Sequence, residues 1–523
     1  MSTRFTSFRG IKDDLSASVV VFLVALPLCL GIGLASTGRP DLVFSGVIAG
    51  IVGGIVVGFF SGSPLGVSGP AAGLVVIVLS AIETLGSFEA LLLATVLAGA
   101  IQLIGGFAKA GIIGYYFPSS VIKGMLAAIG LTLILKEIPH ALGYDKDYMG
   151  DQALTQFDGH NTFNEIIYAF EAISPGAVII SVVSMALLIF FDKPFVKKFA
   201  VFKFLPGALF VVAVGILLNL LFQEVNPSWY LNGEHLVQLP VASTAGEFIS
   251  FFRLPDFSAF SNPQVYVVAV TMALVASIET LLCVEATDKL DPLKRNTPTN
   301  QELKAQGIGN MISGLIGGLP ITQVIVRSSA NITAGAKTKV SAISHGIIML
   351  LAALFIPRLL NLIPLASLAA ILLMVGYKLS NFGLYRNMMR LGHEQFIPFI
   401  VTVISILLTD LLKGIAIGMA VAIFYILRKN YKHSYHYKKE KDQQRETITL
   451  RLSEEVTFLN KASIQATLDQ VPDNAHVVID GSHSLHIDHD VLEIIHDFKA
   501  HAAPMRNITV STIGIREVVL VPH

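Results

Sequence analysis

The residues with the clearest chemical potential are an arginine and a glutamate in segments otherwise made of apolar and small side chains. Arg327 lies in ITQVIVRSS, and Glu279 lies in VASIETLLCVEATDK. A charged group at the centre of a membrane helix costs roughly 2.5–3.5 kcal/mol on insertion scales, so it marks a functional site by default. A guanidinium attracts anions, and a carboxylate takes up a proton or a sodium ion. The alternative is structural: Arg327 pairs with an acid such as Glu279, or with backbone carbonyl groups.

A repeated Gly/Pro pattern precedes two short segments of the chain. Three glycines and a proline recur at one constant offset, first as Gly53, Gly58, Gly62 and Pro64 and then as Gly309, Gly314, Gly318 and Pro320. Each set leads into a short segment, GVSGPAAG or ITQVIVRSS. Short segments interrupted by Gly and Pro at corresponding places in two halves indicate the binding site of a transporter. The alternative is that the glycines only permit close helix packing, and both interpretations can hold together.

Such segments predict an anion site built largely from backbone groups. Helices that begin in the middle of the membrane expose unpaired N–H groups and the positive end of the helix dipole. Small residues allow a small hydrated anion to approach that backbone closely. We therefore expect the substrate to contact residues at two helix starts, namely Ser68, Gly69, Pro70, Ala71, Gln323, Val324, Ile325 and Arg327.

The remaining polar residues favour structural roles. Glu285 and Asp288 lie toward one end of their segment, where a solvated face is expected, and Asp410 lies beside a predicted turn. The run GSHSLHIDHD gathers three histidines that could bind zinc or nickel, although solvated side chains are the favoured interpretation: His483, His486 and His489. The two cysteines lie in apolar runs and offer no disulfide framework. With no nucleophile, paired-carboxylate or phosphate-loop pattern, we expect no enzyme, no cofactor and no metal centre.

Composition places these residues in a membrane protein. Hydrophobic residues make up 53% of the chain, charged residues only 14%, and the mean hydropathy is +0.67, whereas soluble domains carry about 25% charged residues. Because a membrane span needs about 20 apolar residues, we expect about fourteen crossings. Ten segments are long and apolar: 15–36, 43–61, 88–107, 118–136, 174–191, 204–222, 264–284, 338–356, 394–411 and 413–428. Four are shorter or broken by Gly and Pro: 67–82, 305–318, 321–335 and 364–378.

Basic residues predict the orientation of the spans. Two short connections are rich in lysine and arginine, with Lys193, Lys197, Lys198 and Lys203 in one and Lys289, Lys294, Arg295 and Lys304 in the other. The long loops 137–173 and 223–262 hold one basic residue each. The positive-inside rule places the long loops outside and both termini in the cytoplasm. We expect a bacterial inner-membrane protein.

The chain divides into three parts by composition. Residues 1–430 form the predicted membrane domain, and residues 431–446 form a basic linker. Residues 447–523 alternate strand-like runs such as ETITLRL and HVVID with amphipathic helical segments. This last part predicts a small cytoplasmic α/β domain.

The sequence resembles the SulP (sulfate permease) family of inorganic anion transporters over nearly its whole length. Its most specific stretch is NQELKAQGIGNMISGLIGGLPITQVIVRSSANITAGAKTKVSAISHG, residues 300–346. The ALP of the first span (Ala25–Pro27), the GP of the third segment (Gly69–Pro70) and IPLASLAAILLMVG (363–376) fit as well. The C-terminal domain resembles a STAS domain. It is short, with Asp488 and His489 near the place of the family's phosphorylatable serine.

The resemblance implies a fold, a movement and a choice of substrates. The fold is about fourteen segments arranged as two inverted repeats of seven, divided into a core and a gate domain, plus the STAS domain. The substrate would bind between the third and tenth segments, carried by an elevator-like movement in a homodimer. Family substrates include sulfate, bicarbonate, chloride and dicarboxylates, and the 300–346 stretch is most similar to bacterial bicarbonate carriers. A cytoplasmic partner of the STAS domain is also expected.

Two positions where this sequence departs from the family concern the coupling ion. Sodium-coupled bicarbonate relatives carry Asp and Thr in the eighth segment where this chain has Glu279 and Cys283. A hard cation prefers oxygen ligands, so the thiol favours coupling to protons, or anion exchange, over sodium coupling. The preferred interpretation is a secondary transporter of bicarbonate, with sulfate second. The alternatives are a nucleobase carrier on the same fold, an anion channel or exchanger for chloride and dicarboxylates, and a membrane scaffold that transports nothing.

Overall fold

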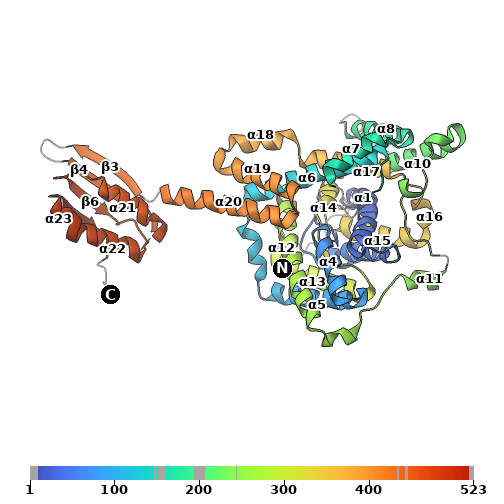
Figure 1. Cartoon of the computed structure of the whole chain (residues 1–523), viewed down its shortest axis with the longest axis horizontal. Helices are drawn as coiled ribbons and strands as arrows, with labels where there is room; N and C mark the ends of the chain where they lie inside the picture. The colour runs from blue at the N-terminus through green and yellow to red at the C-terminus, as the bar shows by residue number, and fades with distance from the viewer. Residues whose placement is uncertain are drawn as a thin grey trace. The chain divides into compact units, whose positions relative to one another are not determined.

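The computed structural model describes residues 10–146, 149, 161–193, 207–242, 244–432, 435–441 and 446–516. Two compact units divide the chain, Met1–Met419 and Ala420–His523, and the division falls within helix α20, Leu411–Lys432 (Figure 1). Several basic residues used to predict the topology lie outside the described residues: Arg4, Arg9, Lys197, Lys198 and Lys203. The first unit is mostly helical and the second combines helices with a sheet.

The first unit confirms the predicted set of apolar segments, since each of them contains a helix. The helices are α1 Ile11–Thr37, α2 Phe44–Val52, α3 Gly58–Phe60, α4 Val75–Leu85, α5 Phe88–Phe107, α6 Ser119–Leu142, α7 Thr162–Glu171, α8 Pro175–Asp192, α10 Gly207–Val225, α11 Ala245–Ser250, α12 Pro263–Leu290, α13 Thr299–Ile316, α14 Ile325–Thr333, α15 Val340–Phe355, α16 Pro357–Leu360, α17 Leu365–Leu379, α18 Phe382–Arg390 and α19 His393–Leu408. Within the described residues, eight helical segments are long and apolar enough to cross a membrane.

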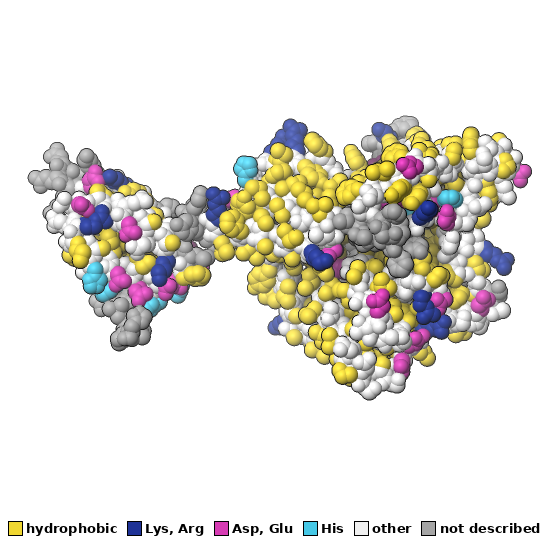
Figure 2. All heavy atoms as spheres, viewed as in Figure 1, with side chains coloured by type: hydrophobic (Ala, Val, Ile, Leu, Met, Phe, Trp, Pro, Cys, Tyr) yellow, Lys and Arg dark blue, Asp and Glu magenta, His cyan; other side chains and the backbone are white. Residues whose placement is uncertain are grey.

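The surface of this unit is apolar where lipid would cover it. Large hydrophobic side chains are exposed on several of the long helices, among them Ile104, Phe107, Val182, Leu217 and Val267. Figure 2 shows hydrophobic side chains spread across the visible face of the unit, with few charged groups among them. A soluble protein rarely exposes so much contiguous apolar surface. The chain is therefore a membrane protein with several spanning helices.

Helices of the first unit pack in two groups. In one group α13 and α12 pack along α5, while α1 packs against α2, α14 and α15. In the other group α6 packs against α17 and α19, and α8 packs against α10 and α17. The groups meet along a seam where α1 contacts α10 and α17, where α14 contacts α17, and where α12 contacts α6.

Small residues allow helix backbones to touch in both groups. Gly99 of α5 and Gly307 of α13 lie so close that a Cβ on Gly99 would be 2.6 Å from the carbonyl oxygen of Gly307. Gly130 of α6 and Gly376 of α17 make the same approach, at 2.7 Å. Since lipid tails are as apolar as leucine, close packing of this kind is a main source of helix association in a membrane.

A buried carboxylate joins two connections of the second helix group. Asp145, which follows α6, accepts hydrogen bonds from Nδ1 of His140 and Nδ1 of His235, each at 2.6 Å. The segment that carries His235 also pairs with the connection before α17, through a bridge between Leu236 and Pro364. The cluster of His140, Asp145 and His235, here called the Asp145 cluster, fixes these loops to the helix ends.

The second unit is a small α/β domain. Its sheet has the order β3-β4-β6-β8, with β3 antiparallel to β4 and the other pairs parallel. The strands and helices are β3 Tyr435–Lys441, β4 Glu446–Leu452, β5 Glu455–Val456, α21 Lys461–Asp469, β6 His476–Asp480, β7 His486–Ile487, α22 His489–Asp497, α23 Ala503–Met505 and β8 Thr509–Ile513. Apolar residues of the strands and helices form its core, including Ile448, Val477, Val491 and Phe498. This confirms the predicted strands and helices and fits a STAS domain.

One part of the expected linker is a strand. Residues 435–441 lie in the segment predicted as a basic linker, yet they form β3 at the edge of the sheet. Apolar and polar residues do not alternate regularly in YHYKKEK, and the run is highly charged. Both features hide the pattern by which a strand is recognised. Lysines on an edge strand discourage pairing with other chains, so the charge suits this position.

The Asp145 cluster gives a prediction on pH-dependent stability. Burial raises the pKa of Asp145, but the hydrogen bonds from His140 and His235 outweigh it, so the pKa lies below its ordinary value. The hydrogen bond to Asp145 raises the pKa of His235 above its ordinary value, against partial burial. Their mutual stabilisation is therefore complete at mildly acidic pH, between the ordinary pKa of an aspartate and that of a histidine. It is lost as pH rises through the raised pKa of His235, or falls through the lowered pKa of Asp145.

We expect Asp145→Asn to lower stability by about 1–3 kcal/mol near neutral pH, because it removes the charge that holds both histidines. Thermal unfolding of the purified protein across a pH series measures this. The wild-type melting temperature should fall toward alkaline pH more steeply than that of the variant. Glu234→Gln is the control, since it removes a carboxylate next to His235 and leaves both hydrogen bonds to Asp145. Parallel pH profiles for wild type and Asp145→Asn would contradict the assignment.

Candidate functional site

Two short strands pair inside the first helix group. β1, Ser68–Pro70, pairs antiparallel with β2, Ile321–Gln323, and Ser68 lies opposite Gln323. All six residues are buried. Outside the register, the Ala71 N–H donates to the Pro320 carbonyl at 3.2 Å. Non-helical backbone of this kind is tolerated at membrane depth only where protein surrounds it.

Each strand leads directly into a helix. After β1 the turn Ala72–Leu74 precedes α4, and after β2 the helix α14 begins at Ile325 with Val324 as its N-cap. The Val324 N–H donates to the Val67 carbonyl at 2.9 Å, so the start of α14 is tied to the chain before β1. The first N–H groups of a helix have no partner within the helix. The strand pair thus joins the two segments that lead into the predicted helix starts, those of α4 and α14.

Arg327 lies in the first turn of α14 and is completely buried. Among the described residues no carboxylate pairs with its guanidinium, and the thiol of Cys29 lies within hydrogen-bonding reach of it. Its neighbours are Gly69 of β1, Cys29 of α1 and His345 of α15. The last two interact electrostatically with the guanidinium. A Cβ on Gly69 would overlap Nη1, so a larger residue at this point of β1 would force the guanidinium to move. The arrangement leaves a cation facing the strand pair without a counter-charge.

Glu279 lies on the other side of the site, on α12. Its carboxylate approaches the turn before α4: a Cβ built on Gly73 would be 2.9 Å from Oε2. Among the described residues Glu279 and Arg327 form no ion pair, and the carboxylate lies instead beside the Gly73 N–H and the Thr322 hydroxyl. One charge therefore faces each helix start. Cys283, one turn after Glu279, is buried on the same helix beside β2.

Gln323 is held by α12 rather than directed at Arg327. Its backbone N–H donates to Oγ1 of Thr280 at 3.3 Å, and its side-chain Nε2 donates to Oγ1 of Thr287 at 3.0 Å. The amide thus anchors β2 to α12. Of the residues proposed from sequence, Ser68, Gly69, Pro70, Ala71, Val324, Ile325 and Arg327 gather at the two helix starts.

A polar stripe on α13 was missed in the sequence. Glu302, Gln306 and Asn310 are spaced four residues apart and are all buried. Gln306 Nε2 donates to Oγ of Ser68 at 2.7 Å and to Glu302 at 3.0 Å. Asn310 accepts from the Ile321 N–H at 2.6 Å and donates back to its carbonyl at 2.9 Å. The stripe supports both strands, and its four-residue spacing was the signal that could have found it.

The other acidic residues bond to local partners, and Asp288, expected on a solvated face, is partly buried. Glu285 pairs with Lys289 at 3.1 Å on the same helix. Asp288 accepts hydrogen bonds from Thr297. Asp410 pairs with Lys413 at 2.9 Å. None of these carboxylates lies at the strand pair.

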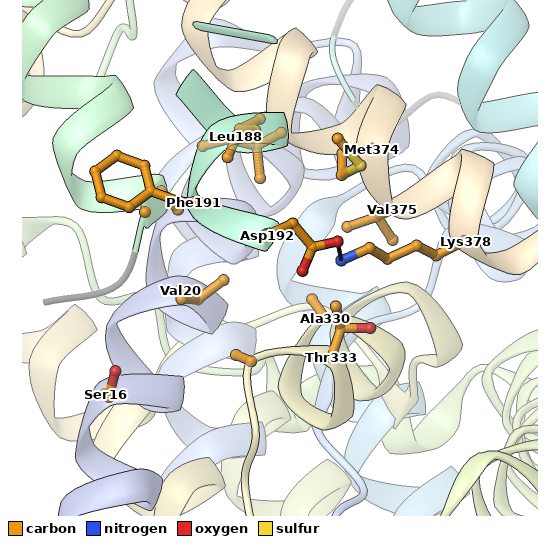
Figure 3. Close-up of a pocket in the computed structure, with 14 residues that line it drawn as sticks. Ser16, Val20, Leu188, Phe191, Asp192, Ala330, Thr333, Met374, Val375 and Lys378 are labelled. Carbon is orange, nitrogen blue, oxygen red and sulfur yellow. Dashed lines mark ion pairs between the residues drawn. The ribbon is translucent and has the colours of Figure 1, made fainter. Parts of the chain in front are cut away.

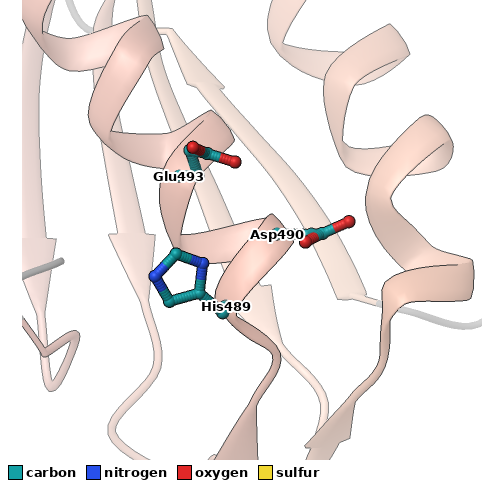
Figure 4. Close-up of side chains that lie close together, drawn as sticks. All are labelled: His489, Asp490 and Glu493. Carbon is teal, nitrogen blue, oxygen red and sulfur yellow. The ribbon is translucent and has the colours of Figure 1, made fainter. Parts of the chain in front are cut away.

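The histidine run of the second unit supplies one candidate ligand group. His489, Asp490 and Glu493 of α22 place their ligand atoms within 4.8 Å of one another (Figure 4). His483 and His486 are not members of this group. The ammonium of Lys461 already lies 3.3 Å from Asp490, and the first turn of a helix repels cations. At least one of its three candidate ligands is therefore already engaged.

Two helices that start inside a membrane bundle beside a buried charge are typical of secondary transporters with broken helices. The sequence pattern of the Sulfate permease family matches residues 11–425, so the chain belongs to this family. "Putative sulfate transporter YvdB" of Bacillus subtilis is 28% identical over 438 residues, covering 82% of this chain and 76% of that protein. "Bicarbonate transporter BicA" of Synechocystis is 26% identical over 426 residues, covering 79% and 69%.

Solved structures support the same fold. A structure of SLC26A9 matches with a TM-score of 0.67 at 15% identity, covering 98% of this chain and 86% of that chain. At 15% identity this similarity shows a shared fold and carries no conclusion about function.

The contact between Gly69 and Arg327 gives a prediction. We expect Gly69→Ala to destabilise the protein by about 1–3 kcal/mol, because its methyl group would overlap Nη1 of Arg327 and force the buried guanidinium to shift. Gly105→Ala of α5 is the matched control, since its Cβ would meet only Ala110, at 3.8 Å. Thermal unfolding of the three purified proteins measures the difference. Equal melting temperatures for the two variants would contradict the close approach.

Proposed function

We propose that the protein is a secondary active transporter of small inorganic anions, with bicarbonate as the preferred substrate and sulfate second. The anion would bind between the N-termini of α4 and α14, against Ser68, Gly69, Pro70, Ala71, Val324 and Ile325, with Gln323 and Arg327 at the second start. The observation that carries the proposal is the completely buried guanidinium of Arg327, which pairs with no carboxylate among the described residues. A buried cation without a counter-charge is costly, and an anion would compensate it.

The charge of the site favours a singly charged anion. One guanidinium balances one negative charge, whereas a doubly charged anion would leave a net charge in a site from which water is largely excluded. Glu279 at the other helix start adds repulsion when ionised. Bicarbonate therefore fits better than sulfate. The likeness to a named bicarbonate transporter supports this choice, and the likeness to a named sulfate transporter keeps sulfate as the second candidate.

Glu279 and Cys283 suggest how transport is driven. An ionised Glu279 competes with the anion for the positive end of the turn at Gly73, and its protonation removes that repulsion. A proton and an anion would then bind together, which is the requirement for symport. The thiol of Cys283 is a poor ligand for sodium. We propose protons as the coupling ion, with no other cofactor.

The packing supports a movement of one helix group against the other. Both broken helices belong to the group of α1 and α5, while α6, α8, α10 and α17 form the second group. These groups correspond to the core and gate of the expected inverted repeats. We propose an elevator-like movement along their seam, in a homodimer of the bacterial inner membrane with both termini in the cytoplasm. The STAS-like unit would bind a cytoplasmic partner.

Transport into proteoliposomes tests the proposal. Uptake of labelled bicarbonate and labelled sulfate would be measured with a proton gradient, a sodium gradient and neither. We expect saturable bicarbonate uptake driven by the proton gradient. Arg327→Ala should raise the KM by about tenfold or more, since 1.4 kcal/mol corresponds to a factor of ten, while Arg358→Ala, at an exposed arginine, should leave it unchanged.

Each other outcome overturns a stated part of the proposal. Sulfate uptake alone would replace the substrate, and non-saturable flux would indicate a channel. Exchange without any gradient would indicate an exchanger for anions such as chloride or dicarboxylates. If neither anion moves, a scaffold without transport becomes the better interpretation.

Glu279 gives a separate prediction about coupling. We expect Glu279→Gln to reduce proton-driven uptake about tenfold or more while anion exchange continues, because an amide cannot exchange the proton. Glu285→Gln is the matched control, since Glu285 lies on the same helix in an ion pair with Lys289. Uptake driven by defined proton gradients measures both variants. Equal effects of the two substitutions would remove the special role of Glu279.

A further inference from the structure

Two cavities lie at opposite ends of α1, both on the seam between the helix groups. One, of about 350 Å³, is lined by Ser16 and Val20 of α1. The other, of about 430 Å³, is lined by Pro27, Leu30 and Gly31. Val20 and Pro27 are about 10 Å apart along the helix at 1.5 Å per residue. Cys29, the neighbour of Arg327, lies between Pro27 and Leu30 on the same helix, with its thiol against Gly50 of α2.

The first cavity also adjoins the helix that carries Arg327. Ala330, Thr333 and Ala334 at the end of α14 line it. Ala330 and Ala334 follow Arg327 by three and seven residues, which places them on one face of the helix. These two residues therefore lie about 5–10 Å from Arg327 along the helix axis.

The opposite wall of the cavity comes from the second helix group. Apolar residues of α8 and α17 cover most of it, including Leu188, Ile371 and Met374. Among the described residues that line it, the only charged ones are Asp192 at the end of α8 and Lys378 at the end of α17. Figure 3 shows the two side chains extended toward one another, across the cavity from Ala330 and Thr333.

The pair of Asp192 and Lys378 is loose. Its N···O distance is 3.4 Å, and the side chains are 46% and 32% exposed. A half-exposed pair of this kind contributes little stability, typically about 0–1 kcal/mol. The ammonium can therefore exchange its carboxylate partner for a free anion at small cost.

We propose that Lys378 is a relay cation for the transported anion, which it binds after the anion leaves Arg327, and that Asp192 limits how tightly it binds. The inference rests on the proposed transport function and on the predicted orientation, which puts the end of α1 at Ser16 on the cytoplasmic side. A mainly apolar cavity holds an anion poorly without a cation. A relay must bind strongly enough to receive the anion and weakly enough to release it, and the competing carboxylate supplies the second condition.

The sign of the charge provides the test. The probe is labelled bicarbonate or sulfate, whichever the wild-type protein transports. Its half-saturating concentration is measured on each face of the protein, using inverted and right-side-out vesicles. We expect Lys378→Met to raise it on the cytoplasmic face by about threefold or more and to weaken its dependence on salt. Asp192→Asn should lower it by about twofold. Values on the outer face should change little in both variants.

Controls separate the relay from a structural pair. Lys378→Arg keeps the charge and should keep the wild-type value, and Lys413→Met removes an exposed lysine that pairs with Asp410 outside the cavity. A merely structural pair would make both single variants worse, in the same direction and on both faces. That result, or wild-type values in Lys378→Met, would overturn the relay while transport itself stands. If the wild-type protein moves neither anion, the proposed function fails and the relay fails with it.

Discussion

An arginine buried away from water is stable only if something compensates its charge, and in Arg327 this requirement shapes the architecture around it. Desolvating such an ion costs several kcal/mol even after relaxation. Gly69 gives the guanidinium its space, and Cys29 and His345 surround it without neutralising it. The two helix starts bring further positive potential to the same place. The site therefore concentrates positive potential in a membrane interior.

The strand pair imposes a second constraint, because unwound backbone inside a membrane must find partners within the protein. β1 and β2 bond to each other, and the polar stripe of α13 supports both strands from one side. Gln323 ties β2 to α12 on the other side. The polar groups of α13 and α12 thus serve mainly to keep the helix starts in register. This explains why many buried polar residues surround the site without facing the place where an anion would bind.

Much of this could be predicted from sequence, because apolar length and Gly/Pro interruptions are local signals. They placed the long helices of the membrane unit and both helix starts, and strand and helix patterns identified the second unit. The short helices α7 and α11 lie in stretches predicted as loops, and α18 lies between two predicted segments. The direction of a side chain is not local. Gln323 lies at the predicted helix start, yet its side chain bonds to Thr287 of α12. Glu302 accepts a hydrogen bond from Gln306, which in turn bonds to Ser68. Both side chains are oriented by partners on helices or strands far away in the sequence. β3 was hidden by the charges that suit an edge strand.

The pairing of Ser68 with Gln323 has a consequence for how the protein is made. The partners are separated by most of the membrane unit, so during synthesis the segment around β1 enters the bilayer long before β2 exists. Until then its backbone groups lack their final partners, and contacts so distant in sequence form late. The first half of the chain is thus an incomplete intermediate, dependent on the insertion machinery or on transient helix contacts. The membrane unit is complete only when the segment that carries β2 and Arg327 has been inserted and β2 has paired with β1.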